Sequence, residues 1–258
     1  MLNMARADFY RLFRSKGLYI TEVVLIFIVL ISIFNKTVGL ILGNSGSLST
    51  FQAANNGHYW NAVHATNAMT SMTSLLIYII LPLFIMTIGF EFSRKIYKNP
   101  LSSGMTRLNY FISKYCVFIV ITILQFIFYY AAIFLIAGFK NGFGHINGHF
   151  FTKLFETVGT QILEVSAIFS IAVLALYLTF STIASVITTI IFPVCISVLG
   201  AVFEKQHWLQ NLNFQNRIDS AYYTNYSTAH LHTMLTYSFG FIFVCLLLAY
   251  LTFRKRDL

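Results

Sequence analysis

Long apolar runs separated by short polar stretches dominate this sequence. A helix that crosses the hydrocarbon core of a bilayer needs about 20 mostly apolar residues. Six runs reach this length, and we predict that they form the transmembrane helices of one all-α domain covering residues 1–258. The predicted spans are residues 18–42, 71–90, 115–138, 159–180, 183–203 and 234–253.

The composition excludes a soluble protein. Hydrophobic residues make up 57% of the chain and charged residues only 10%, whereas a soluble domain carries about 25% charged residues to cover its surface. The 27 phenylalanines and only 3 prolines also exclude a disordered or fibrous chain. Cys116, Cys195 and Cys245 all lie in apolar runs, and we predict that they are packing residues rather than disulfide or metal ligands.

The distribution of lysine and arginine predicts the orientation of the spans. Most of the 17 cationic residues fall before span one, between spans two and three, or after span six. Cytoplasmic segments carry such an excess, so we expect both termini in the cytoplasm, and we interpret the net charge of +9 as orientation rather than nucleic-acid binding. This requires an uncharged turn near Ser181 and Thr182. A cleaved signal peptide over residues 1–34 is the disfavoured alternative, because its apolar run is too long.

Residues 1–17 have the pattern of an amphipathic helix on the membrane surface. Asp8, Arg11 and Arg14 are predicted to lie off its apolar face. The pattern alone favours an interfacial anchor held by anionic lipid, and the alternative is a lever that contacts a cytoplasmic partner. The apolar face consists of Leu2, Ala5, Phe9, Leu12 and Phe13.

The longest charged stretch, residues 91–114, joins spans two and three. Pro100 and Gly104 are predicted to divide it into a short helix, a turn and a second helix that leads into span three. The bulky residues Phe92, Ile96 and Tyr97 stand among its charges, and a simple solvated loop would not need them. We therefore interpret it as a docking element, with a solvated loop as the alternative. Its charged residues are Glu91, Arg94, Lys95, Lys98, Arg107 and Lys114.

Aromatic and polar residues alternate between spans five and six, over residues 204–232. Such mixtures are typical of the headgroup level of a bilayer. We predict a folded or re-entrant cap over the outer end of the bundle, and a simple interfacial belt is the alternative. The cap residues that we single out are Trp208, Phe214, Arg217, Asp219, Tyr222 and Tyr223.

Two carboxylates, Glu22 and Glu164, fall inside the predicted spans. We place Glu22 near the inner end of span one and Glu164 near the outer end of span four, where water or a neighbour satisfies each. Because there is no carboxylate at mid-depth and no internal repeat, we do not favour a secondary transporter.

Motifs of enzyme chemistry are missing from the sequence. It contains no phosphate loop, no His-Glu-x-x-His zinc helix and no Gly-x-Ser-x-Gly nucleophile elbow. We predict no catalytic residues and no cofactor or metal bound by this chain. The histidine pairs His145/His149 and His230/His232 are interpreted as outer-loop residues rather than metal ligands.

Two local patterns resemble those of permease subunits of type-2 ATP-binding-cassette exporters. In that family a Glu after span two is followed by an Arg and, seven residues later, by a Lys. Glu91, Arg107 and Lys114 occupy these places, although Gly104-Met105-Thr106 stands where the family often has Pro-x-Ser. The second pattern is the C-terminal Phe253-Arg254-Lys255-Arg256-Asp257-Leu258. The resemblance covers the whole chain.

The resemblance implies a function in a bacterial plasma membrane. Two permeases would face each other as a homo- or heterodimer, and each would dock a separate ATPase subunit that binds ATP and Mg²⁺. Residues 91–100 would be the coupling helix and the N-terminal helix a second contact, with Phe9, Arg11, Leu12, Phe13 and Arg14 at the interface. On this basis we expect Glu91→Arg to spare folding and uncouple the ATPase.

Within the resemblance, only the size and composition of the permease chain point to a substrate. Short, Phe-rich permeases of this kind are similar to those of lantibiotic self-immunity systems and of the exporter of phenol-soluble modulins, which move amphipathic peptides. Export of drugs, ions or lipids by the same architecture stays open. So does a membrane immunity protein that only sequesters a peptide, for which the aromatic outer cap would provide the binding surface.

Overall fold

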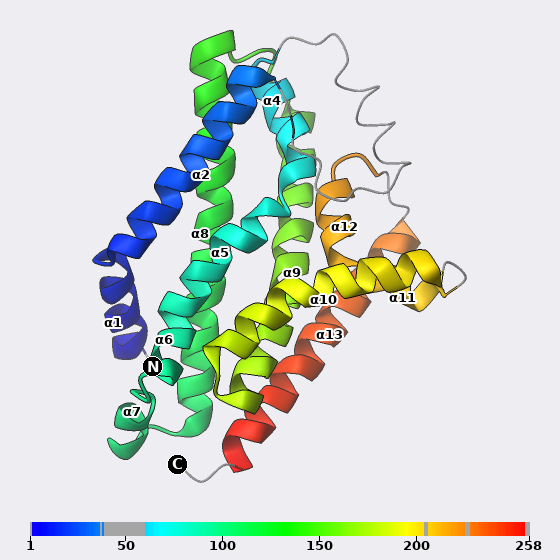
Figure 1. Cartoon of the computed structure of the whole chain (residues 1–258). Helices are drawn as coiled ribbons and strands as arrows, with labels where there is room; N and C mark the ends of the chain where they lie inside the picture. Colours follow the sequence, from blue (N-terminus) through cyan, green and yellow to red (C-terminus); the bar gives the residue numbers. More distant parts are fainter. Residues whose placement is uncertain (1, 37, 39–59, 204–205, 225–227, 256–258) are drawn as a thin grey trace.

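The computed structural model of the protein describes residues 2–36, 38, 60–203, 206–224 and 228–255, and these fold as helices and turns without strands. Six helices in the described residues are long and apolar enough to cross a membrane (Figure 1). The chain is therefore a multi-pass membrane protein, and the predicted all-α class with six spans is confirmed. The spans are α2 (Lys16–Asn35), Leu75–Ser93, α8 (Arg107–Asn141), α9 (Gly148–Thr179), α10 (Thr182–Val202) and α13 (Thr228–Lys255).

The span boundaries differ from the prediction in both directions. Helix α2 ends at Asn35 because Lys36 adopts a left-handed conformation (φ 52°) and its N–H donates to the carbonyl of Ser32. The predicted residues 39–42 lie outside the described part. Helices α8 and α9 have 35 and 32 residues, which is about 50 Å each against a hydrocarbon core of about 30 Å. Polar residues ended the predicted spans there, but they do not end the helices.

The N-terminal helix α1 (Leu2–Phe13) packs against α8 and the end of span two. Leu12 is buried there with Leu83 and Val117. Asp8 is only 5% exposed, so the prediction that it lies off the packed face is wrong. The apolar pattern could not indicate that Asp8 is buried, because its burial depends on pairing with cations. Ser15 separates α1 from α2 by accepting a hydrogen bond from the Leu18 N–H (3.3 Å).

Span two is interrupted near its proline. Pro82 has no N–H to donate within the helix, and three residues later the helix widens into one π-helical turn. Two short elements, α4 (Ala62–Met69) and the 3₁₀ turn η1 (Thr70–Met72), precede span two. Span two itself consists of α5 (Leu75–Phe84), the π turn η2 (Ile85–Gly89) and α6 (Phe90–Ser93).

A sharp turn joins spans four and five. Phe180 adopts a left-handed conformation (φ 55°) after α9, and Ser181 caps α10 by accepting a hydrogen bond from the Ala184 N–H (3.4 Å). The predicted turn near Ser181 and Thr182 is confirmed, and α10 runs back along α9 (Figure 1). This turn, α1, the short helix α7 (Lys98–Ser102) and the end of α13 lie at one end of the bundle (Figure 1). We name it the basal end and the opposite one the apical end.

Two short helices, α11 (His207–Asn211) and α12 (Phe214–Ser220), fold where the cap was predicted. Helix α12 packs on α9, η1 and α10, with Phe214 and Ile218 fully buried. Trp208 in α11 is 53% exposed. Of the two helices in the predicted cap, α12 therefore belongs to the bundle, whereas α11 lies on its surface.

The cysteines do not all pack as predicted. Cys245 is buried, but Cys116 and Cys195 are exposed on the bundle surface, and all three thiols are free. Apolar neighbours in the sequence indicated membrane depth and not burial inside the protein.

The basal position of α1 and of the end of α13 (Figure 1) gives a first testable expectation. A cysteine added after Leu258, in a chain whose own three cysteines are replaced by serine, is expected to stay unlabelled by an impermeant thiol reagent in intact cells and to react after permeabilisation. A cysteine at Lys140, at the apical end of α8, is the control and is expected to react in intact cells. The reverse labelling pattern would invert the predicted orientation.

Candidate functional site

Charged side chains from three segments meet at the basal end in what we name the basal cluster: Asp8, Arg11, Glu91, Tyr110 and Lys114. The Lys114 ammonium donates to both carboxylate oxygens of Asp8, at 2.8 and 2.7 Å, and also to Oε1 of Glu91. Arg11 Nη1 donates to the same Glu91 oxygen (3.0 Å), and the Tyr110 hydroxyl donates to Glu91 Oε2 (2.7 Å). The cluster therefore ties α1, α6 and α8 together.

The basal cluster is buried and balanced in charge. Asp8, Glu91 and Lys114 are 5%, 6% and 1% exposed, and two carboxylates face two cations. Burial raises the pKa of the Asp8 carboxyl above its ordinary value, and the nearby Lys114 ammonium opposes this shift. Buried ions are tolerated only when they are paired in this way.

The widened turn of span two also contributes to this cluster. Arg11 Nη2 donates to the carbonyl oxygens of Met86 and Thr87, both at 3.3 Å. These oxygens belong to the π turn, where the regular hydrogen-bond ladder is altered. The irregularity that follows Pro82 thus helps to seat the N-terminal helix.

The structure divides the predicted coupling residues into two groups. Glu91, Phe92 and Lys114 are buried, so the expectation that they form a contact surface is wrong. Arg94, Lys95 and Lys98 are exposed around the turn into α7, and we name them the basal cations. Ile96 and Pro100 are half-buried in the same segment.

Aromatic packing also anchors the segment that carries the basal cations. The Phe92 ring lies 5.0 Å from Tyr97, 4.7 Å from Tyr177 and 5.3 Å from Phe180, measured between ring centroids. Phe253 of α13 packs 5.1 Å from Tyr177. The bulky residues that set the docking element apart in the sequence thus fix it to α9, to the turn before α10 and to α13.

The two sequence patterns that resemble those of exporter permeases contact each other in the structure. Arg107 Nη1 donates to the carbonyl oxygens of Phe253 (3.0 Å) and Arg254 (2.7 Å). A cation at the last turn of a helix satisfies carbonyls that have no partner in the helix. Arg256, Asp257 and Leu258 of the C-terminal pattern lie outside the described residues.

A second group of buried polar residues, which we name the apical cluster, holds α12: Glu164, Arg217 and Ser238. Arg217 Nη2 donates to Glu164 Oε2 (2.8 Å) and lies 2.9 Å from the Ser238 hydroxyl, which donates to Glu164 Oε1 (2.9 Å). All three residues are less than 9% exposed. They join α9, α12 and α13.

Hydrogen bonds extend from this cluster to η1 and α8. Gln161 Nε2 donates to the carbonyls of Ile218 (2.9 Å) and Thr70 (3.2 Å), and the Tyr130 hydroxyl donates to Gln161 Oε1 (2.6 Å). Asp219 accepts from the Ser74 N–H (2.9 Å). Burial raises the pKa of Asp219, which lies outside the six spans, to about 7.

The remaining cap residues take different positions. Tyr223 donates to the carbonyl of Asn67 (2.8 Å), and Tyr222 packs on Tyr223 with ring centroids 5.2 Å apart. Of the interface residues on α1, Phe9 lies 6.4 Å from Phe13, and Arg14 stacks on Tyr10. Phe13 is 52% exposed.

The two carboxylates in the spans both have neighbours as partners. Glu22 accepts from Gln125 Nε2 (3.2 Å). The position of Glu164 near the outer end of the predicted span stays a prediction; in the structure α9 begins at Gly148, so Glu164 lies at the middle of the helix. Its partner Arg217 was assigned to the cap without any pairing, because 53 residues separate the two in sequence.

Sequence comparison shows the family but no activity. Residues 24–258 match a family described as a protein of unknown function (DUF2705), and the chain belongs to this family. No curated protein matches the chain. Among the described residues, no three His, Cys, Asp or Glu side chains are grouped so that they could hold a metal ion.

Proposed function

We propose that the chain is the permease of an ATP-driven exporter in a bacterial plasma membrane, powered by a separate cytoplasmic ATPase subunit that binds ATP and Mg²⁺. The observation that carries the proposal is the exposed group of basal cations on a rigidly held turn. Arg94, Lys95 and Lys98 project from a segment whose buried residues are locked by the basal cluster and by aromatic packing. A rigid charged projection suits a protein that receives force from a soluble partner.

The helix contacts support a path for that force. Glu91, in the helix before the turn into α7, accepts from Arg11 of α1 and from Lys114 of α8, and Lys114 also donates to Asp8 of α1. Helix α8 continues from there through the bundle to the apical end (Figure 1). A push on the basal cations would reach α1 and α8 together. ATP-driven closure of the partner would then favour one of two permease states, by binding them with different affinity.

The surface of the bundle leaves room for lipid and a second permease copy. Helices α2, α10 and α13 bury only about a fifth of their apolar windows within the chain (22% each), compared with 61% for α9. We propose that these exposed faces meet lipid and a second copy, in a homo- or heterodimer. The proposed cargo is an amphipathic or hydrophobic substrate, foremost a toxin or antimicrobial peptide, with drugs, ions and lipids as alternatives.

Charge reversal tests the docking role of the basal cations. We expect Lys95→Glu/Lys98→Glu to lose a stoichiometric companion with a phosphate-loop motif when the tagged protein is purified from its native membranes in mild detergent. Both side chains are exposed, so the free energy of unfolding should change by less than about 0.5 kcal/mol. The matched control, Lys140→Glu/Lys153→Glu, reverses the same charge at the apical end and should keep the companion.

Sequestration of a peptide without transport is the second candidate function. The buried polar anchoring of α12 favours it, because such a fixed cap also suits a binding surface. ATP-dependent uptake of peptide into inverted vesicles that hold the purified complex would dismiss it. A wild-type chain that stays without a companion in several detergents would support it and would remove the docking role of Lys95 and Lys98.

A further inference from the structure

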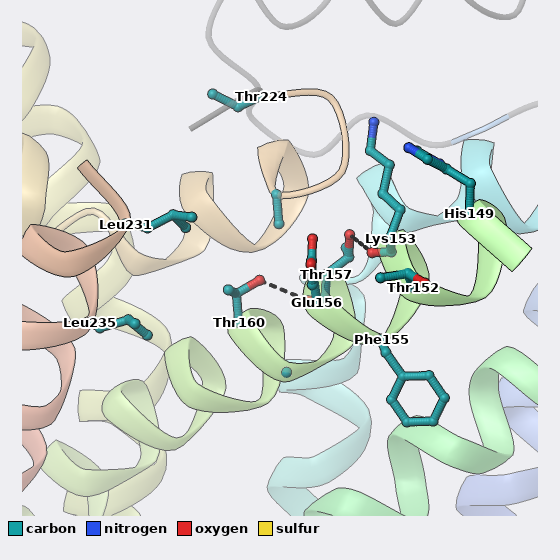
Figure 2. Close-up of a pocket in the computed structure, with 12 residues that line it drawn as sticks. His149, Thr152, Lys153, Phe155, Glu156, Thr157, Thr160, Thr224, Leu231 and Leu235 are labelled. Carbon is teal, nitrogen blue, oxygen red and sulfur yellow. Dashed lines mark hydrogen bonds between the residues drawn. The ribbon is translucent and has the colours of Figure 1, made fainter. Parts of the chain in front are cut away.

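An open pocket of about 720 Å³ lies at the apical end, between the first half of α9, the turn after α12 and the start of α13 (Figure 2). This volume falls in the range of small-molecule sites, about 300–1,000 Å³. Neither the basal cluster nor the apical cluster contributes a residue to its lining.

The two sides of the pocket differ in chemistry. Lys153 and Glu156 project from α9 on one side, and Leu231 and Leu235 of α13 face them from the other (Figure 2). The Lys153 ammonium lies 4.5 Å from the centroid of the Tyr222 ring. The ion pairs found in the described part of the chain join other side chains. Lys153 and Glu156 thus line one pocket as opposite charges, each without an ionic partner there.

The threonine hydroxyls of the wall are already engaged. The hydroxyl of Thr157 donates to the carbonyl of Lys153, and that of Thr160 donates to the carbonyl of Thr157, each at 2.8 Å. This leaves the Lys153 ammonium and the Glu156 carboxylate as the charged groups for a ligand, beside the His149 imidazole. Lys153 and Glu156 are three residues apart on one helix, so their stems are about 5–6 Å apart.

The position of the pocket along the helices indicates its depth in a membrane. Lys153 and Glu156 precede the apolar part of α9, which begins near Gly159, and Leu231 and Leu235 begin the apolar part of α13. Charged groups therefore lie at the headgroup level, and the leucines lie beside the acyl chains.

We propose that this pocket binds the headgroup of a zwitterionic phospholipid of the phosphoethanolamine type. The phosphate would meet Lys153, the ammonium group would meet Glu156, and one acyl chain would run along Leu231 and Leu235. The spacing of the two charges suits the adjacent phosphate and ammonium of this headgroup, and the bilayer supplies the ligand directly. The inference needs only the membrane-spanning fold and does not depend on export.

Native mass spectrometry of the detergent-purified full chain, given equal amounts of phosphatidylethanolamine and phosphatidylglycerol, tests the proposal. The wild type is expected to retain phosphatidylethanolamine in preference. Lys153→Gln should lower its retention about threefold, as for a partly exposed ion pair. Glu156→Gln should lower it similarly and shift the preference to phosphatidylglycerol. Leu231→Trp should fill the pocket and abolish the preference.

Lys140→Gln is the matched control, because the Lys140 ammonium also lies over an aromatic ring at the apical end, 3.5 Å from the Phe34 centroid, but lines no part of the pocket. It should bind lipid as the wild type does. Equal retention by Lys153→Gln, Leu231→Trp and Lys140→Gln would overturn the proposal. An equimolar cationic amphipathic peptide provides a second test. If it displaces the lipid from the wild type but not from the pocket variants, the proposal is overturned and the pocket is assigned to peptide.

Discussion

Replacing Lys114 by methionine is expected to destabilise the folded protein by about 3–5 kcal/mol, the cost of removing one partner from a buried ion pair. Lys114 is 1% exposed and donates to Asp8 and Glu91. Without its ammonium, two buried carboxylates face only the half-exposed Arg11. We expect a lower midpoint of thermal unfolding in detergent and loss of the monodisperse peak in size-exclusion chromatography.

Lys98→Met is the matched control, because it removes the same charge from an exposed position at the same end of the bundle (Figure 1). Its stability should equal that of the wild type. The triple variant Asp8→Asn/Glu91→Gln/Lys114→Met removes the uncompensated charges and should recover part of the lost stability. If Lys114→Met unfolds at the wild-type midpoint, the basal cluster does not hold α1 against α8.

The same geometry revises the expectation for Glu91→Arg. On a surface coupling element this change would spare folding, but Glu91 is buried and accepts hydrogen bonds from Arg11, Tyr110 and Lys114. An arginine there would leave three cations beside a single carboxylate, Asp8. A loss of ATPase coupling in this variant would report lost structure, so the exposed Lys95 and Lys98 are the better test of docking.

The hydropathy of the sequence was enough to predict the number of spans and their approximate positions, because lipid exposure requires long apolar runs. The division of residues 91–114 was predicted only in part: Gly104, with a positive φ of 89°, lies in the turn between α7 and α8, but Pro100 lies inside α7, and the other break falls at residues 94–97. Hydropathy could not show that α8 and α9 continue past the apolar core. Polar residues at a helix end do not stop a helix when tertiary contacts support it.

The buried charge pairs were beyond sequence reasoning for a related reason. Asp8 and Lys114 are 106 residues apart, and Glu164 and Arg217 are 53 apart. Each residue taken alone resembles a solvated charge. The available signal was the cost of burial: a carboxylate in an apolar span implies a cation nearby. The predicted cap contains two cations, Lys205 and Arg217, so this argument would have predicted a partner for Glu164 without choosing between them.

The second large effect is expected at the apical end, where Glu164→Gln should release α12 from the bundle. Glu164 is the carboxylate partner of Arg217 and also accepts from Ser238. Arg217 is 7% exposed, and its Nε and Nη1 groups have no hydrogen-bond partner in the described part of the protein. Loss of the negative charge would leave a buried cation with only uncharged neighbours, a cost of about 3–5 kcal/mol.

This cost can be met by local opening, because α12 is short and other contacts hold the long helices together. We therefore expect Glu164→Gln to expose a cysteine at Ile218, which is fully buried in the native protein, to a thiol reagent at least about tenfold faster. The labelling is measured in a background in which the three native cysteines are serine. Glu156→Gln, which removes an exposed carboxylate from the same helix, is the control and should leave the rate unchanged.

The double variant Glu164→Gln/Arg217→Met separates a locking role from simple packing. If the charge pair holds α12 only by avoiding an unpaired buried ion, removing both charges should restore slow labelling of the Ile218 cysteine, because no unpaired charge is then buried. If labelling stays fast, the charge-assisted hydrogen bonds themselves lock the helix. If Glu164→Gln alone labels slowly, the remaining bonds of Gln161 and Asp219 are sufficient, and the apical cluster does not control the position of α12.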